Sequence, residues 1–151
     1  QKAIDYLNAK KDADKIALLT KQIAAIHSQL RNAPKSIETF KLYVDRVKNL
    51  EGYKLEVGDA YRRIAEEYEK IQNLDEAAQY WDKFIDIYRN GNKPELAIAG
   101  KMKQCSLYLK GNKQVKGVDC FEDVFVWASR ELGEDHKLTN DAFEILKAYK
   151  K

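Results

Sequence analysis

Residues 55–88 contain two amphipathic stretches separated by a short polar break. Apolar residues recur every three or four positions from Val57 to Ile71 and again from Ala77 to Tyr88, which places each set on one helical face. The break at residues 72–75 interrupts this pattern, and Asp75 is a residue type that caps the start of a helix. The stretch therefore predicts a helical hairpin. A chain with such a hairpin at its centre is far more readily a helical fold than a β-sheet fold.

The composition also favours helices. The chain of 151 residues has seven glycines and two prolines, and 34% of its residues are charged. Ala, Leu, Lys and Glu, which are strong helix formers, outweigh the β-branched residues. A chain of this length can bury one substantial core, and no shift in composition marks a second domain. We therefore predict a single all-α domain over residues 1–151.

The same periodicity predicts about seven helices in total. Besides the two in the central hairpin, amphipathic stretches with helix-ending signals lie at residues 13–30, 34–50, 96–109, 115–132 and 137–149. Long helices joined by short breaks favour helical hairpins that follow one another along the chain.

Superposing the first helix of each pair indicates a repeat near 40 residues. The aligned positions are Ile26-His27, Ile64-Ala65, Gln104-Cys105 and Ile145-Leu146, at successive spacings of 38, 40 and 41 residues. In the second helices, the aligned positions are Tyr43, Trp81 and Phe121. This pattern predicts a right-handed α-solenoid, and ends without a polar capping helix favour a segment of a longer array.

The central hairpin resembles the tetratricopeptide repeat (TPR). A 34-residue unit numbered from Gly58 places six residues on the best-known pattern positions of that repeat: Tyr61, Ile64, Ala65, Tyr68, Ala77 and Trp81. The terminal proline of the pattern is replaced by Arg89, and Phe84 stands where a small residue is usual. The resemblance implies a TPR-like helical repeat protein that binds other proteins.

Among TPR-like families, the chain is most similar to the soluble NSF attachment proteins (SNAPs). The similarity lies in a proline-led helix from Pro34 and in the Ile-Ala-Glu-Glu-Tyr-Glu run of residues 64–69. It implies an adaptor that binds a helical SNARE-type bundle and recruits an AAA ATPase in vesicle fusion. The membrane-contacting loop and the acidic, leucine-containing tail of SNAPs are not visible in this sequence.

Two alternatives remain open. Residues 131–136 are similar to the loop that joins kinesin-light-chain repeats. This similarity implies a generic adaptor of kinesin-light-chain or LGN type for transport, cytoskeletal or ciliary assembly. The other alternative is a peptide-sensing TPR regulator, which would need an effector domain that these residues lack.

Charge and apolar content narrow the possible partners and location. The 27 basic and 24 acidic residues give a net charge of +3, spread evenly, which argues against nucleic-acid binding. No run approaches the length of a membrane span, so we expect at most peripheral membrane association. Cys105 and Cys120 stand at helical positions flanked by apolar residues. We expect reduced thiols, and therefore a cytoplasmic protein, either free or peripheral to membranes or cytoskeleton.

Candidate catalytic groups are few. His27 occupies a small-residue position in our alignment and is expected to pack against a neighbouring helix, and His136 is expected to be solvated in a loop. The two cysteines lack CxxC spacing and are expected to be core residues. No glycine-rich phosphate loop, GxSxG or HExxH motif occurs. We therefore predict no enzyme activity, and no catalytic, cofactor or metal site.

The exposed face of the first helices is the predicted binding surface. In TPR-like stacks these helices line the concave side, where residues between the packing positions face the groove. The predicted partner-binding residues are Arg62, Arg63, Glu66, Lys101, Met102, Lys103, Ser106, Lys110 and Lys147, with Ala24, Ala25 and Ser28 on the earliest helix. Residues 97–118 contain five lysines and no acidic residue. The predicted partners are therefore other proteins that present helical or acidic segments.

Overall fold

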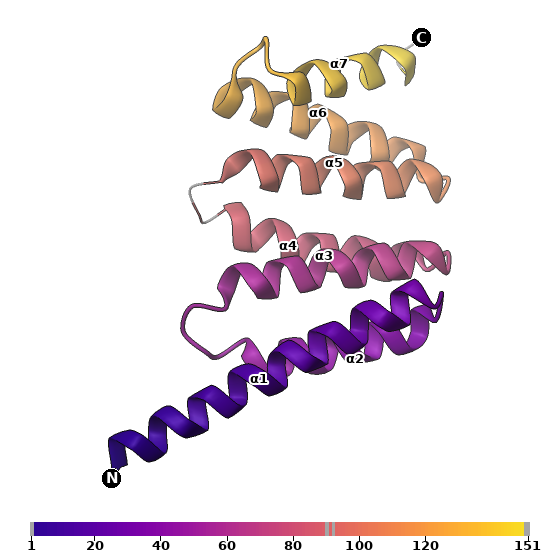
Figure 1. Ribbon diagram of the computed structural model, residues 1–151. Coiled ribbons are helices and arrows are strands. Elements are labelled where there is room, and N and C mark those ends of the chain that lie inside the picture. The colour runs from indigo at the N-terminus through magenta and orange to yellow at the C-terminus, as the bar shows by residue number, and fades with distance from the viewer. Residues whose placement is uncertain (1, 90, 92, 150–151) are drawn as a thin grey trace. The chain divides into compact units, whose positions relative to one another are not determined.

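The computed structural model describes the backbone of residues 2–89, 91 and 93–149, and their side chains from residue 10 onward. The described backbone contains no strand and forms seven helices (Figure 1). They are α1 (Lys2–Gln29), α2 (Ala33–Val47), α3 (Lys54–Lys70), α4 (Leu74–Arg89), α5 (Pro94–Lys110), α6 (Gln114–Leu132) and α7 (Lys137–Tyr149). The predicted all-α class is thus confirmed. The helix predicted from residue 13 begins at Lys2 instead.

The chain divides into two compact units, residues 1–71 and residues 72–151. In the first unit, α1 packs on α2, and α2 packs on α3. In the second, α4 packs on α5, α5 on α6 and α6 on α7. Phe40, Tyr43 and Val47 are buried in the first unit, and Ile98, Phe121 and Val124 in the second. The single domain and the right-handed solenoid over all residues stay predictions.

One residue with a positive φ lies between the two helices of each hairpin. Arg31, Gln72 and Asn112 have φ angles of 55°, 61° and 58°. The left-handed conformation lets the backbone reverse direction directly after a helix. Because Gln72 follows Arg31 by 41 residues and Asn112 follows Gln72 by 40, these turns establish the repeat spacing. The predicted 38-residue spacing of the first two repeats is wrong by three residues, nearly one helical turn.

The corrected spacing aligns small buried residues in every hairpin. In the first helices these residues are Ala24, Ala65 and Cys105; in the second helices they are Ser36, Ala77 and Gly117. Buried aromatic residues follow at one position of the second helices, namely Phe40, Trp81 and Phe121. We aligned Tyr43 with Trp81 and Phe121, but Tyr43 lies three residues after the equivalent position, which Phe40 occupies. Within the hairpins α1–α2 and α5–α6, the small residues allow the paired helices to approach closely.

The misalignment arose from α1, where large aliphatic residues are exposed and small residues are buried. Ala24 is fully buried, and its carbonyl accepts a 3.1 Å hydrogen bond from the Ser36 hydroxyl on α2. Ile26 on the same helix is half exposed. The periodicity of the large residues therefore marked the wrong face. His27 is consequently equivalent to Tyr68 at the helix end, rather than to a small residue, and is partly exposed.

Asparagine side chains cap the second helices of the first two hairpins. Asn32 Oδ1 accepts the backbone N–H of Lys35 at 3.3 Å, and Asn73 Oδ1 accepts that of Glu76 at 3.4 Å. The prediction that Asp75 caps α4 is therefore wrong. Asp75 lies two residues after Asn73, inside the first turn of α4, and is therefore not the capping residue.

Candidate functional site

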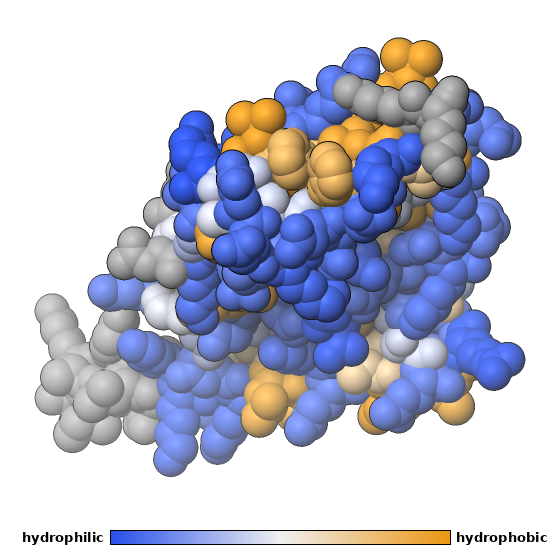
Figure 2. All heavy atoms as spheres, turned by 90° about the horizontal axis from the view of Figure 1, so that it is seen from above, coloured by the Kyte–Doolittle hydropathy of each residue, from blue (hydrophilic) through white to orange (hydrophobic). Residues whose placement is uncertain are grey.

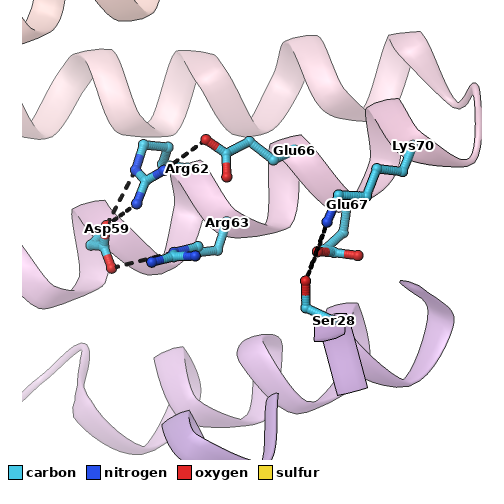
Figure 3. A network of polar contacts seen from close by, with 7 residues as sticks. All are labelled: Ser28, Asp59, Arg62, Arg63, Glu66, Glu67 and Lys70. Carbon is cyan, nitrogen blue, oxygen red and sulfur yellow. Dashed lines mark hydrogen bonds and ion pairs between the residues drawn. The ribbon is translucent and has the colours of Figure 1, made fainter. Parts of the chain in front are cut away.

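The exposed face of α3, in the first unit, carries a network of paired charges (Figure 3). Arg62 contacts Asp59 through Nη2 at 2.6 Å and Glu66 through Nη1 at 2.7 Å. Arg63 Nε lies 3.9 Å from the other Asp59 oxygen. Burial disfavours the charged form of Arg62, but hydrogen bonds and charges from the two carboxylates outweigh it and raise the pKa of this guanidinium. The predicted residues Arg62, Arg63 and Glu66 thus lie together, with their charges largely balanced locally.

A buried carboxylate lies beside this face. Glu67 is 3% exposed and accepts hydrogen bonds from the Ser28 hydroxyl on α1 and from Lys70 Nζ, the latter at 2.6 Å (Figure 3). Lys70 Nζ also lies 3.2 Å from the Ser28 oxygen. Ser28, predicted to face a groove, therefore helps to join α1 to α3. Ala24 of the same predicted set is buried and does not face a groove.

The predicted lysines of α5, in the second unit, point to two different sides of that helix. Successive helical residues are rotated by about 100°, so Lys101 and Lys103 point in nearly opposite directions. Lys101 Nζ donates to Gln104 Oε1 at 2.6 Å, and Gln104 in turn donates to the Ala78 carbonyl on α4 at 3.0 Å. The prediction that Lys101 and Lys103 share one face is wrong, because they are two residues apart.

One exposed stripe of α5 remains basic. Lys103, Ser106 and Lys110 are exposed and lie three and four residues apart, which places them along one side of the helix. Met102 flanks this stripe and is half-buried, and its carbonyl accepts the Ser106 hydroxyl at 2.9 Å. We call Lys103, Ser106 and Lys110 the basic stripe. In the second unit, the basic stripe remains the predicted binding surface.

Lys101 belongs instead to a hollow between α5 and α6. The hollow has a volume of about 440 Å³ and is lined by Lys101, Tyr108, Val115, Lys116, Asp119, Cys120 and Asp123. The Lys116 ammonium lies 4.2 Å from the centre of the Tyr108 ring. Two carboxylates therefore line this hollow together with two ammonium groups, so the lysines of residues 97–118 do not make a purely basic surface at this place. The carboxylates belong to Asp119 and Asp123 on α6, which follow the lysine-rich run of residues 97–118.

Lys113 is also paired with a carboxylate. Its Nζ lies 2.5 Å from Asp75 Oδ1 on α4. The hydrogen bond and the charge of Lys113 lower the pKa of the Asp75 carboxyl. Burial, together with the negative charge of Asp82, raises the pKa of the Tyr108 hydroxyl in the same region. The lysines between residues 97 and 118 are thus partly balanced by acidic groups of the neighbouring helices.

Lys147 does not continue the basic stripe. Thr139, Ala142 and Leu146 are buried on α7 in the same pattern as residues 97, 100 and 104 on α5, which gives a spacing of 42 rather than the predicted 41. Lys147 therefore corresponds to Cys105. Its Nζ pairs with Glu144 at 3.1 Å and lies 5.6 Å from the Phe143 ring centre.

The face of α7 turned away from α6 is largely polar, with exposed Asn140, Glu144 and Lys147 beside Phe143. Figure 2, which views the α7 end, shows mostly hydrophilic residues with small hydrophobic patches. Phe143 and Tyr149 are also exposed on α7, so the absence of a polar capping helix stays a prediction.

Cys105 and Cys120 form a disulfide that joins α5 to α6. The expectation of two reduced thiols is wrong, because the hairpin places the two positions opposite each other, with their Cα atoms 5.4 Å apart. The turn at residues 111–113 brings the two cysteines together, so no short sequence motif predicts the disulfide. The argument for a cytoplasmic location that rested on reduced thiols loses its support.

His136 has a structural role. Its Nδ1 accepts the backbone N–H of Leu138 at 3.2 Å at the start of α7, and its Nε2 lies 3.8 Å from Glu95 Oε1. His136 thus lies in a loop, as predicted, but its side chain is only partly exposed and contacts neighbouring groups. Within the described residues, no three His, Cys, Asp or Glu side chains are grouped so that they could hold a metal ion. The described helices include none with the length and apolar content needed to cross a membrane.

An arginine–tryptophan pair was missed in the sequence. The Arg89 guanidinium lies 4.6 Å from the centre of the Trp127 ring. Together with Pro94, Arg130 and Glu131, these residues line a hollow of about 360 Å³. The replacement of the usual TPR proline by Arg89 was the signal that could have drawn attention to this position.

The fold is similar to that of solved TPR-like repeat proteins. BtubC (BKLC) from P. vanneervenii matches 95% of this chain at 15% identity, with a TM-score of 0.67. A kinesin-light-chain-like protein of Podosopora anserina with nearly identical TPR-like repeats matches 86% at 15% identity, with TM-scores of 0.60 and 0.59 in two structures. These similarities confirm the predicted class of TPR-like helical hairpins. The matches span 59% and 63% of those longer proteins.

No protein-family model matches the sequence, and neither does any curated protein.

Proposed function

We propose that this chain is a non-catalytic scaffold or adaptor that binds other proteins, and that the basic stripe on α5 is a main contact. The observation that carries the proposal is the exposure of Lys103, Ser106 and Lys110 along one side of a first helix. Such a row suits an acidic or helical segment lying along the helix. Charge attraction would mainly speed association and make binding sensitive to salt.

The contrast with α3 supports this choice of surface. On α3 the equivalent face pairs Arg62 with Asp59 and Glu66, so that its cations are already engaged. The basic stripe contains two lysines and no carboxylate. An acidic partner on α3 would have to displace these ion pairs, whereas the basic stripe itself presents no carboxylate.

Two kinds of adaptor are possible, a SNAP-like one and a generic one of kinesin-light-chain or LGN type. The similar structures named above include kinesin-light-chain-like repeats, and they give the SNAP-like version no support. They show the fold alone at 15% identity, so the generic transport or cytoskeletal adaptor also rests on analogy. Both versions agree on protein partners and differ in which proteins the chain should retain.

A pull-down with matched variants tests the proposal. The wild-type chain, K103E/K110E and the control K48E/K137E are immobilised, and proteins retained from lysate are identified by mass spectrometry at low and moderate salt. The two variants change charge equally, and the control alters exposed lysines elsewhere. We expect acidic proteins to be retained by the wild type and the control and lost with K103E/K110E and at higher salt.

Equal retention by all three chains would refute the role of the basic stripe. SNARE proteins or an AAA ATPase among the retained proteins would favour the SNAP-like version. Motor, polarity or cytoskeletal proteins would favour the generic adaptor. Retention that is lost only in the control K48E/K137E would indicate that the binding surface lies near those lysines.

A further inference from the structure

The hollow that contains Arg89 is formed by three helix ends of the second unit. Arg89 is the last residue of α4, Pro94 is the first of α5, and Trp127, Arg130 and Glu131 belong to the last two turns of α6. Figure 1 shows these three ends on the same side of the unit. The volume of about 360 Å³ exceeds that of a single carboxyl or phosphate group. None of these lining residues belongs to the basic stripe on α5.

Arg89 is held by an aromatic ring instead of a carboxylate. Its guanidinium lies over the Trp127 ring, 4.6 Å from the ring centre. Within the part of the chain that the structure describes, Arg89 is not paired with a carboxylate. A π face attracts the cation but does not replace carboxylate oxygens as hydrogen-bond acceptors. The planar N–H groups of Arg89 can therefore bind an incoming carboxylate through two hydrogen bonds.

Arg130, by contrast, is already engaged. Its Nε and Nη2 both lie 3.0 Å from Glu131 Oε1. The described lining of the hollow thus presents one guanidinium without a carboxylate partner, beside one ion pair. A carboxylate, with a single negative charge, matches this balance. A phosphate group carries up to two charges and would meet the negative charge of Glu131 with only one uncompensated cation. The charges therefore favour a carboxylate over a phosphate.

We propose that this hollow binds a peptide segment of a partner protein through a carboxylate side chain. Arg89 contacts the carboxylate, and Trp127 and Pro94 form an apolar wall for a neighbouring apolar side chain of the same segment. Pockets that recognise small groups commonly combine apolar walls with a few polar contacts in this way. The inference rests on the proposed function only in taking the partner to be a protein, and it is independent of the basic stripe.

An array of capped pentapeptides tests the site. The peptides form pairs that differ only in a central Glu or Gln, with varied neighbours, and the labelled wild type, R89Q and R31Q are applied. R31Q removes another exposed arginine, and the equivalent Gln72 shows that Gln accepts the positive φ of that turn. The wild type and R31Q should bind some Glu peptides about tenfold more tightly than their Gln partners, because a charged hydrogen bond is lost in the latter. R89Q should lose this preference.

NMR spectroscopy locates the bound peptide. Trp81 is buried, so the indole N–H signal of Trp127, assigned with W127F, reports on the hollow. The best Glu peptide should shift this signal in the wild type, R31Q and K103E/K110E, and not in R89Q.

Three results would overturn the inference. They are a wild type without preference for Glu peptides, a preference that R89Q keeps, and inorganic phosphate shifting the Trp127 signal at lower concentration than the peptide. A preference that K103E/K110E loses and R89Q keeps would assign the binding to the basic stripe, so that the proposed function would stand and this inference would fail.

Discussion

Gly117 lies at a close contact between α6 and α5. A Cβ atom at this position would lie 2.4 Å from Leu109 Cδ2 and 2.7 Å from Cγ. It would also lie 3.2 Å from the Leu109 backbone nitrogen. The leucine side chain can rotate away, but the backbone nitrogen is fixed by the helix. The substitution Gly117→Ala therefore strains the hairpin, whereas the equivalent Ser36 and Ala77 show that α2 and α4 accept a Cβ.

Two opposing effects set the size of the change. Overpacking a core contact costs about 1–3 kcal/mol. Replacing glycine by alanine inside a helix gains about 1 kcal/mol. We expect the free energy of unfolding of G117A to fall by about 1 kcal/mol. The control G91A adds a methyl group whose nearest atoms, two backbone carbonyl oxygens, lie 3.7 and 3.8 Å away. We expect it to change stability by less than about 0.5 kcal/mol.

Urea denaturation followed by circular dichroism measures both variants against the wild type. The midpoint and the slope are fitted together, because a changed slope would signal a change other than stability. A G117A chain that is about 1 kcal/mol more stable than the wild type would refute the reasoning. That result would show that helix propensity outweighs the close contact and that α6 can move away from Leu109 at little cost.

Three further predictions concern other contacts. C105A/C120A should lose about 3 kcal/mol in urea unfolding, since the disulfide closes a loop with a sequence separation of 15 residues; an unchanged midpoint would contradict this. The hydrogen bond from Tyr53 to Asp14 raises the pKa of that phenol to about 12, above its unfolded value. Its contribution to stability should therefore be complete below about pH 10 and be lost as the pH rises toward 12, and Y53F should abolish this loss. Tyrosine absorbance of D14N should show one phenol titrating at lower pH than in the wild type. F121A should destabilise the chain by about 3–5 kcal/mol, measured by thermal or urea unfolding, because the ring is fully buried; a loss under about 1 kcal/mol would contradict this.

Amphipathic periodicity predicted the seven helices of the described backbone, because each carries an apolar stripe whose spacing is visible in the sequence. The repeat near 40 residues also follows from that spacing. Periodicity did not predict the correct alignment of the first hairpin, because α1 exposes its large aliphatic residues and buries Ala17 and Ala24. A large residue usually indicates the buried face, and here it indicates a face that another molecule or helix can cover.

The candidate surface was predictable only in part. The basic stripe follows from residues on one helix, and helical rotation alone separates Lys101 from Lys103. The carboxylates that meet Lys101, Lys113 and Lys116 come from α4 and α6, and only the packing of helices brings them there. The disulfide depends in the same way on how α5 and α6 are paired.

The central claim is that partner proteins contact the basic stripe of α5. A photo-reactive residue in place of Ser106 tests this most directly, with the same residue in place of Val126 on α6 as the control. Both positions are exposed. The proposed scaffold predicts a light-dependent cross-link from position 106 to a protein retained in the pull-down, and little from position 126. Cross-links from position 126 with none from position 106 would contradict it.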